Sequence, residues 1–250
     1  KKATWFLYGI SVLGFILQFI TYRLKLSDAT LKEIVLFRIG WVPLVQLGLV
    51  ILSLLLLKSK WKVPRLLFLG SALILFSLTG HSAAPEYGGR LGFIMTSIHL
   101  LSIAIWMGGL LALVMVPKEQ PLICLKEVGI KFSRWALISI LAITVSGVWM
   151  SLTYVHTFNW NSLLGSEWGK ALLYKVLFFL GIVFVGYWQR KSLTKITQAR
   201  VLPFLARAWV ELSVGILILL FAAILVDMSP KAAQRGIYPK TVVSEGVQAT

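Results

Sequence analysis

The sequence contains almost no cysteine and few acidic residues. Its single cysteine, Cys124, rules out an intramolecular disulfide bond and any paired-cysteine metal motif. Lysine and arginine number 25 against 9 aspartates and glutamates, which gives a formal charge of +16. These basic residues are grouped in short segments between long apolar runs, as is typical of membrane loops held at the cytoplasmic face. This distribution of the basic residues therefore argues against nucleic acid as a partner.

Signatures of enzymatic chemistry are also missing. The sequence has no HExxH zinc motif, no GxSxG nucleophile motif and no DKTG-like phosphorylation motif. Residues 165–170, GSEWGK, have the wrong spacing and ending for a phosphate-binding loop. We therefore expect no enzymatic activity, and uphill pumping driven by ATP is not encoded in this sequence.

Long apolar runs dominate what is present. Hydrophobic residues fill 58% of the 250 positions and the mean hydropathy is +0.85, well above the values of a soluble domain. Seven runs approach or exceed the roughly 20 residues that a helix needs to cross the hydrocarbon core. They predict an all-α fold, a polytopic transmembrane helical bundle spanning residues 1–228. The predicted helices lie near residues 5–22, 34–57, 65–80, 92–116, 132–154, 169–188 and 208–228.

The basic connections predict the orientation of this bundle. Connections after the second, fourth and sixth helices are rich in Lys and Arg, whereas those after the third and fifth offer only Arg90 and Lys170. The positive-inside rule then places the C-terminal tail, residues 229–250, outside the cell. This tail resembles a linker to a following outer domain. We expect the chain to be a piece of a longer protein, in which one more helix before Lys1 would make eight.

Residues 95–113, MTSIHLLSIAIWMGGLLAL, carry a chemically distinct helix face. At about 100° per residue, one stripe contains Met95, His99, Ser102 and Trp106. A thioether and an imidazole one turn apart suit a soft metal such as copper. His99 is the strongest candidate ligand because a polar group inside a bilayer is costly and tends to be functional. Trp106 is interpreted as packing.

Other candidate ligands follow from the predicted topology, which places all three histidines in the outward half. With Met95 and His99, the candidate metal ligands are His81, His156 and Met150. Ordinary turn chemistry is the alternative for His81, and a solvated loop side chain is the alternative for His156.

Two charged residues fall inside predicted helices and are candidates for an ion or proton relay. They are Lys175 in the sixth helix and Glu211 in the seventh. The long stem of Lys175 also allows it to reach the lipid headgroups. Glu211 has its own alternative, an ion pair with Arg207 one turn earlier.

The segment 99–113 resembles the His…Trp-x-Gly-Gly signature of the CopD copper-resistance membrane domain family. The resemblance extends over the second half of the chain, from near Leu91 to Pro230, although Trp168 stands where tyrosine is commoner. The further matching segments are Ser146–Gly147, residues 168–175 and residues 211–215.

The resemblance implies import of copper ions across the bacterial cytoplasmic membrane through an outward His/Met site. Some Gram-positive members are similar in fusing an outward CopC-like copper-binding domain, so the implied partners are copper ions, such a domain or protein, and the lipid bilayer. Two alternatives stay open. One is a b-type haem-binding electron carrier, and the other is a membrane anchor or sensor for flanking outer domains.

Overall fold

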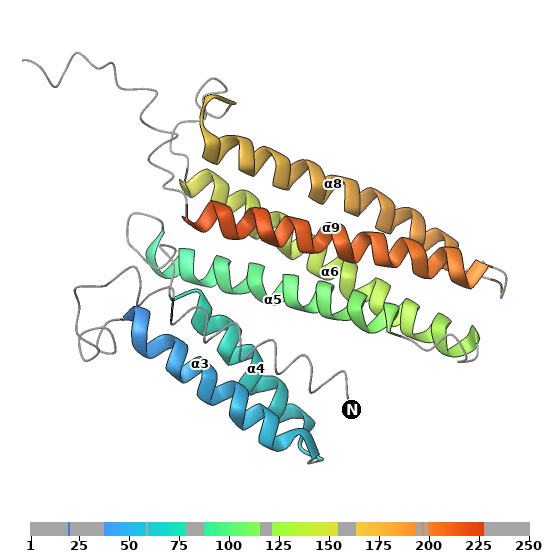
Figure 1. Cartoon of the computed structure of the whole chain (residues 1–250), viewed down its shortest axis with the longest axis horizontal. Coiled ribbons are helices and arrows are strands. Elements are labelled where there is room, and N and C mark those ends of the chain that lie inside the picture. Colours follow the sequence, from blue (N-terminus) through green and yellow to red (C-terminus); the bar gives the residue numbers. More distant parts are fainter. Residues whose placement is uncertain are drawn as a thin grey trace, which may run out of the picture. The chain divides into compact units, whose positions relative to one another are not determined.

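The computed structural model describes residues 20, 38–58, 60–78, 88–115, 122–154, 164–193, 197 and 200–227. Over these residues the chain forms six α-helices, one short 3-10 helix and no strand, which confirms the all-α class (Figure 1). The predicted helix at 5–22 lies outside the described residues, apart from its position 20. The α-helices are α3 (Arg38–Leu55), α4 (Lys62–Phe76), α5 (Gly89–Val114), α6 (Leu122–Tyr154), α8 (Glu167–Leu193) and α9 (Val201–Asp227), and the 3-10 helix is η1 (Leu56–Lys58).

Four of these helices are long and apolar enough to cross a membrane. The four spans are Gly89–Val114, Leu125–Thr153, Glu167–Leu193 and Val201–Ala223, and α3 adds a shorter apolar stretch, Trp41–Leu55. Large apolar side chains cover their outer surfaces, for example Leu141 on α6 and Phe184 on α8, which are 59% and 65% exposed. In water such exposure would be unfavourable, whereas lipid tails accommodate it. The chain is therefore a multi-pass membrane protein.

Three helices extend further than the hydropathy of the sequence predicts. Helix α6 begins at Leu122 rather than near residue 132, and α9 begins at Val201 rather than near residue 208. Hydropathy falls at the charged residues in these extensions, but each extension buries one apolar face, as Leu125 and Phe204 show. Helix α8 continues to Leu193, with two basic residues in its last turn, where they interact favourably with the helix dipole.

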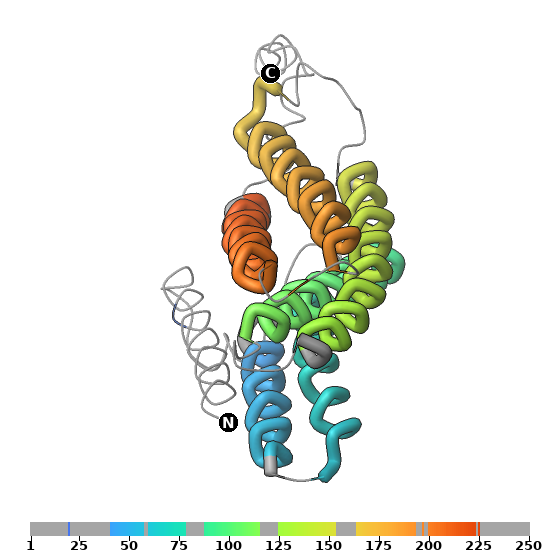
Figure 2. The backbone as a smooth tube through the Cα atoms, turned by 90° about the vertical axis from the view of Figure 1, so that its right-hand side faces the viewer, coloured from blue at the N-terminus to red at the C-terminus, as the bar shows by residue number. Residues whose placement is uncertain are grey.

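Residues 1–101 form one packing unit, in which α3 and α4 lie side by side (Figure 2). Val50 of α3 and Ala72 of α4 are the buried centre of their interface. The Gln46 side-chain amide donates a 2.8 Å hydrogen bond to the Ala72 carbonyl, which ties the two helices together through a buried polar group. This unit thus combines apolar packing with polar contacts inside the apolar layer.

Residues 102–250 form the second unit, which contains the rest of α5 with α6, α8 and α9. Helix α8 packs along α9, and the end of α8, the start of α9 and the start of α6 lie at the same end of this unit (Figure 1). The basic residues that predict a cytoplasmic location lie at these helix ends. The core cluster at this end consists of Leu110, Leu113, Val114, Leu125, Leu193, Phe204, Leu205, Ala208 and Leu212.

Glycines bring the helices of the second unit close together. A Cβ atom at Gly109 would lie 2.6 Å from the Phe132 ring, and one at Gly215 would lie 2.6 Å from the Met107 sulfur. Real Cβ atoms do not approach so closely, so a side chain at either position would force its neighbour to move. The Phe132 ring is rigid, whereas the end of the Met107 side chain is flexible. Gly108 differs, because a Cβ atom there would meet nothing within 4 Å. Of these two neighbouring glycines, only Gly109 is needed for the close packing of α5 against α6.

We predict that Gly109→Ala destabilises the chain whereas Gly108→Ala does not. Both substitutions gain the helix propensity of alanine, but only that at residue 109 forces the Phe132 ring to move, at a cost of about 1–3 kcal/mol. The thermal unfolding midpoints of the two variants in detergent measure the difference. Phe132→Leu should restore part of the loss in Gly109→Ala. Equal midpoints for the two alanine variants would contradict the packing assignment.

Candidate functional site

The stripe predicted along α5 faces the interior of the protein. His99, Ser102 and Trp106 are 7%, 8% and 5% exposed, and Met95 is half-buried one turn before His99. The helix is apolar around most of its circumference, so lipid would be an acceptable environment for many of its faces. The chain instead turns the imidazole inward. His99 is therefore placed where a polar side chain interacts with protein rather than with lipid.

Further polar groups lie near His99 in the first unit. Ser97 of α5 donates a 2.8 Å hydrogen bond to the carbonyl of Phe93, and its hydroxyl lies 2.8 Å from that of Ser77. Ser77 is the residue at which α4 ends, and it is 2% exposed. These contacts connect α4 to the helix that carries Met95 and His99, and they hold that part of α5 in a defined rotation.

The remaining candidate ligands are not brought together in the part of the chain that the structure describes. His81 and His156 lie outside the described residues, and Met150 is half-buried on α6 in the second unit. Among the residues described, no three His, Cys, Asp or Glu side chains gather into a group that could hold a metal ion. The ligand set beyond Met95 and His99 therefore stays a prediction.

The two intramembrane charges have different environments. Lys175 is half-buried on α8 and pairs with no carboxylate of the described segments. Glu211 is 5% exposed and lies about three turns after the start of α9, deeper than the sequence predicts. Glu211 and Arg207 do not form an ion pair; the Arg207 Nε instead donates a 3.2 Å hydrogen bond to the carbonyl of Pro203.

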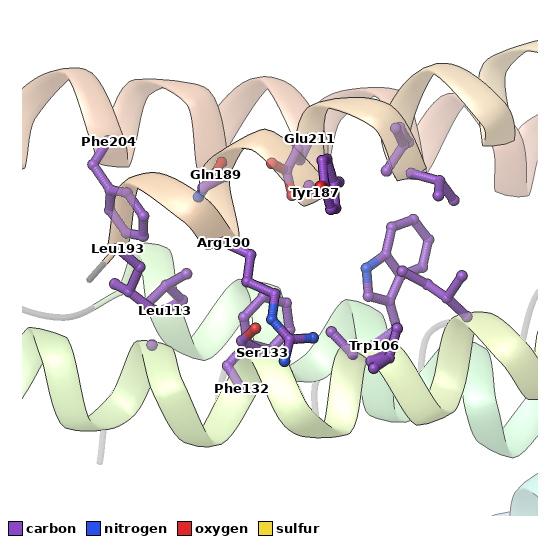
Figure 3. A pocket seen from close by; sticks show the side chains of 17 residues that line it. Trp106, Leu113, Phe132, Ser133, Tyr187, Gln189, Arg190, Leu193, Phe204 and Glu211 are labelled. Atoms are coloured by element: carbon purple, nitrogen blue, oxygen red, sulfur yellow. The ribbon is translucent and has the colours of Figure 1, made fainter. Parts of the chain in front are cut away.

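Glu211 lines a cavity of about 160 Å³ between the four helices of the second unit (Figure 3). Gln189 of α8 lines the same cavity and is also 5% exposed. Oε1 of Glu211 and Oε1 of Gln189 are both buried, and neither accepts a hydrogen bond from any described residue. The lining of the cavity also includes Trp106, Phe132, Ser133, Gly186, Tyr187 and Arg190.

The carboxyl group lies close to α8. A Cβ atom at Gly186 would lie 3.9 Å from Oε2 of Glu211, which is an ordinary van der Waals distance. Arg190 extends toward Ser133 on α6 and away from Glu211 (Figure 3). The cavity thus contains a carboxyl oxygen and an amide oxygen that accept no hydrogen bond from the described residues.

Gln189 is a residue that the sequence pattern does not reveal. It precedes Arg190 and Lys191 near the end of an apolar run, where a glutamine is expected to face water or lipid headgroups. Its burial depends on the packing of α8 against α6 and α9, which hydropathy does not report. Only the depth of Glu211 in an apolar helix gives a signal for this cavity.

We predict that Glu211→Met raises the stability of the chain. Methionine fills a similar volume without leaving buried oxygen atoms unpaired, a condition that costs about 1–3 kcal/mol per group. Glu127→Met on the exposed surface of α6 serves as the matched control. Thermal midpoints in detergent compare the two variants with the parent chain. A lower midpoint for Glu211→Met would mean that the carboxyl has a stabilising partner.

Comparison with known proteins gives two matches. Residues 126–225 match the model of the CopD family, described as copper resistance protein D, a range that covers most of α6, all of α8 and most of α9. The chain is also 30% identical over 192 residues to the copper transport protein CutJ of Bacillus subtilis. That alignment covers 74% of this chain and 34% of CutJ, so the chain spans about a third of the length of this relative. No solved structure matches the chain.

Proposed function

We propose that this chain, which belongs to the CopD family, carries copper ions inward across the bacterial cytoplasmic membrane. The name of the relative from Bacillus subtilis, a copper transport protein, supports the substrate. The four apolar spans support a location in the membrane that a transported ion must cross. The observation that carries the proposal is the burial of His99 on α5, one turn after Met95.

The chemistry of this pair suits copper. A thioether is a soft ligand that suits reduced copper, and an imidazole binds copper well, whereas hard cations such as magnesium or calcium favour oxygen ligands. Burying an imidazole in a membrane helix is costly, and a metal ion that binds it offsets the cost. Met95 and His99 are the proposed first ligands, and His81, Met150 and His156 are the proposed further ones.

The proposed direction follows from the basic ends of the helices and from the membrane potential. If the basic end of the second unit faces the cytoplasm, as the positive-inside rule predicts, then Met95 and His99, near the opposite end of α5, face outward. A cation bound there moves inward down the membrane potential, which is worth about 2.3 kcal/mol per charge per 100 mV. The donor of copper is proposed to be an outer CopC-like domain or protein.

No observation favours the haem alternative. Axial ligation by two imidazoles requires a second histidine at a matching depth, and His99 is the only histidine among the residues that the structure describes. The absorption spectrum of the purified chain separates the two functions, because bound haem gives a Soret band and copper bound to His and Met does not.

We predict that His99→Ala and Met95→Leu each slow copper uptake by cells that express the chain. Loss of one ligand should reduce the initial rate by about tenfold or more, since even supporting residues of metal sites contribute tenfold. Met115→Leu is the matched control, because this methionine is 48% exposed near the opposite end of α5. Unchanged uptake by His99→Ala at equal expression would overturn the assignment.

A further inference from the structure

We propose that the cavity around Glu211 and Gln189 is a proton-binding site, in which the Glu211 carboxyl binds and releases a proton as copper is transported. The link to copper rests on the proposed function, whereas proton binding by this cavity does not. The site belongs to the second unit and lies among α5, α6, α8 and α9.

The two unpaired oxygen atoms indicate what the cavity binds. Oε1 of Glu211 and Oε1 of Gln189 are buried acceptors without a donor from the described residues. An acceptor left unpaired in an apolar interior is unfavourable, so the ligand must supply positive charge or a hydrogen-bond donor. An anion would add a third acceptor beside a carboxyl group. The cavity is therefore built for a proton, for water that carries it, or for a small cation.

The lining favours a proton over copper. Histidine, cysteine and methionine, the side chains that suit copper, are all missing from the residues that line the cavity. Carboxyl and amide oxygens are hard ligands and bind reduced copper poorly. A volume of about 160 Å³ holds several water molecules, each of which needs roughly 10–15 Å³ of such space. Water in the cavity gives the carboxyl a partner for proton exchange.

The charged and titratable groups around the carboxyl come from α8 and α9. Helix α8 contributes Arg190 and Tyr187 to the cavity, and Arg207 lies one turn before Glu211 on α9. Helices α5 and α6 contribute no titratable side chain to its lining. Arg190 extends toward α6 (Figure 3), and the Arg207 Nε donates its hydrogen bond to the carbonyl of Pro203, so neither guanidinium forms an ion pair with the carboxyl.

The cavity also has a route to the protein surface. Tyr187 and Arg190 line it and are both exposed, and Arg190 lies in the last turn of α8, at the basic end of the second unit. A proton can therefore pass between the Glu211 carboxyl and water at that end. Trp106 closes the side formed by α5, the helix that also carries His99.

Infrared spectroscopy of the purified chain in lipid nanodiscs tests proton binding directly. During a pH titration, the carbonyl stretch of a protonated buried carboxyl appears and disappears separately from the bands of ionised carboxylates. We expect this band in the parent chain and its loss in Glu211→Gln. Glu127→Gln, on the exposed surface of α6, should keep the band, and Glu211→Asp should retain a band at a shifted position. A band that persists in Glu211→Gln would overturn the proposal, as would its absence from the parent chain.

Two additions to the titration identify the ligand and its role. Replacing choline chloride with sodium chloride should leave the midpoint unchanged, and a sodium-dependent shift would overturn the choice of a proton. Adding copper should change the band in the parent chain but not in His99→Ala. If the band titrates normally and copper never alters it, the coupling is overturned while proton binding stands. Failure of the transport proposal itself appears separately, as unchanged copper uptake in His99→Ala.

Gln189→Leu tests the second residue of the site. This variant keeps the carboxyl but removes the amide from the same cavity, so the band should remain and its titration midpoint should shift. An unchanged midpoint would remove Gln189 from the site. Size-exclusion profiles of the variants in detergent verify that each one is folded.

Discussion

The cost of burying polar side chains within membrane-spanning helices constrains the whole of this structure. An apolar helix can face lipid on any side, so sequence hydropathy alone leaves its rotation open. In α5 the polar residues Ser97, His99 and Ser102 are all buried, although Ser97 lies on a different face of the helix from the other two. In α9 the buried Glu211 turns toward α8. The polar groups for which we propose functions are thus buried within the helices that carry them.

Close packing by glycine then decides where space remains. Gly109 and Gly215 let α5 approach α6 and α9 closely. The cavity that remains among these helices is bordered by Leu113, Leu193 and Phe204 of the apolar cluster at the basic end. We propose that copper binds to the thioether and imidazole ligands of α5. The proton is proposed to bind at the oxygen atoms of α8 and α9.

Much of the fold could be predicted from the sequence, because a membrane-spanning helix requires a long run of apolar residues. The all-α class and the buried stripe of α5 followed from run length and helical period. The residues at which α6 and α9 begin could not be predicted in this way, because the mean hydropathy falls at charged residues even where one face of the helix stays apolar. The burial of Gln189 is not visible in the sequence because it depends on three packed helices. The expected ion pair between Glu211 and Arg207 does not form, because the Arg207 Nε donates its hydrogen bond to the carbonyl of Pro203.

X-ray absorption at the copper edge of the copper-loaded chain tests whether His99 and Met95 bind copper. We expect both nitrogen and sulfur neighbours around copper in the parent chain. His99→Ala should remove a nitrogen contribution and Met95→Leu a sulfur contribution. A spectrum with only oxygen neighbours, or one that neither substitution changes, would contradict the assignment of these two ligands.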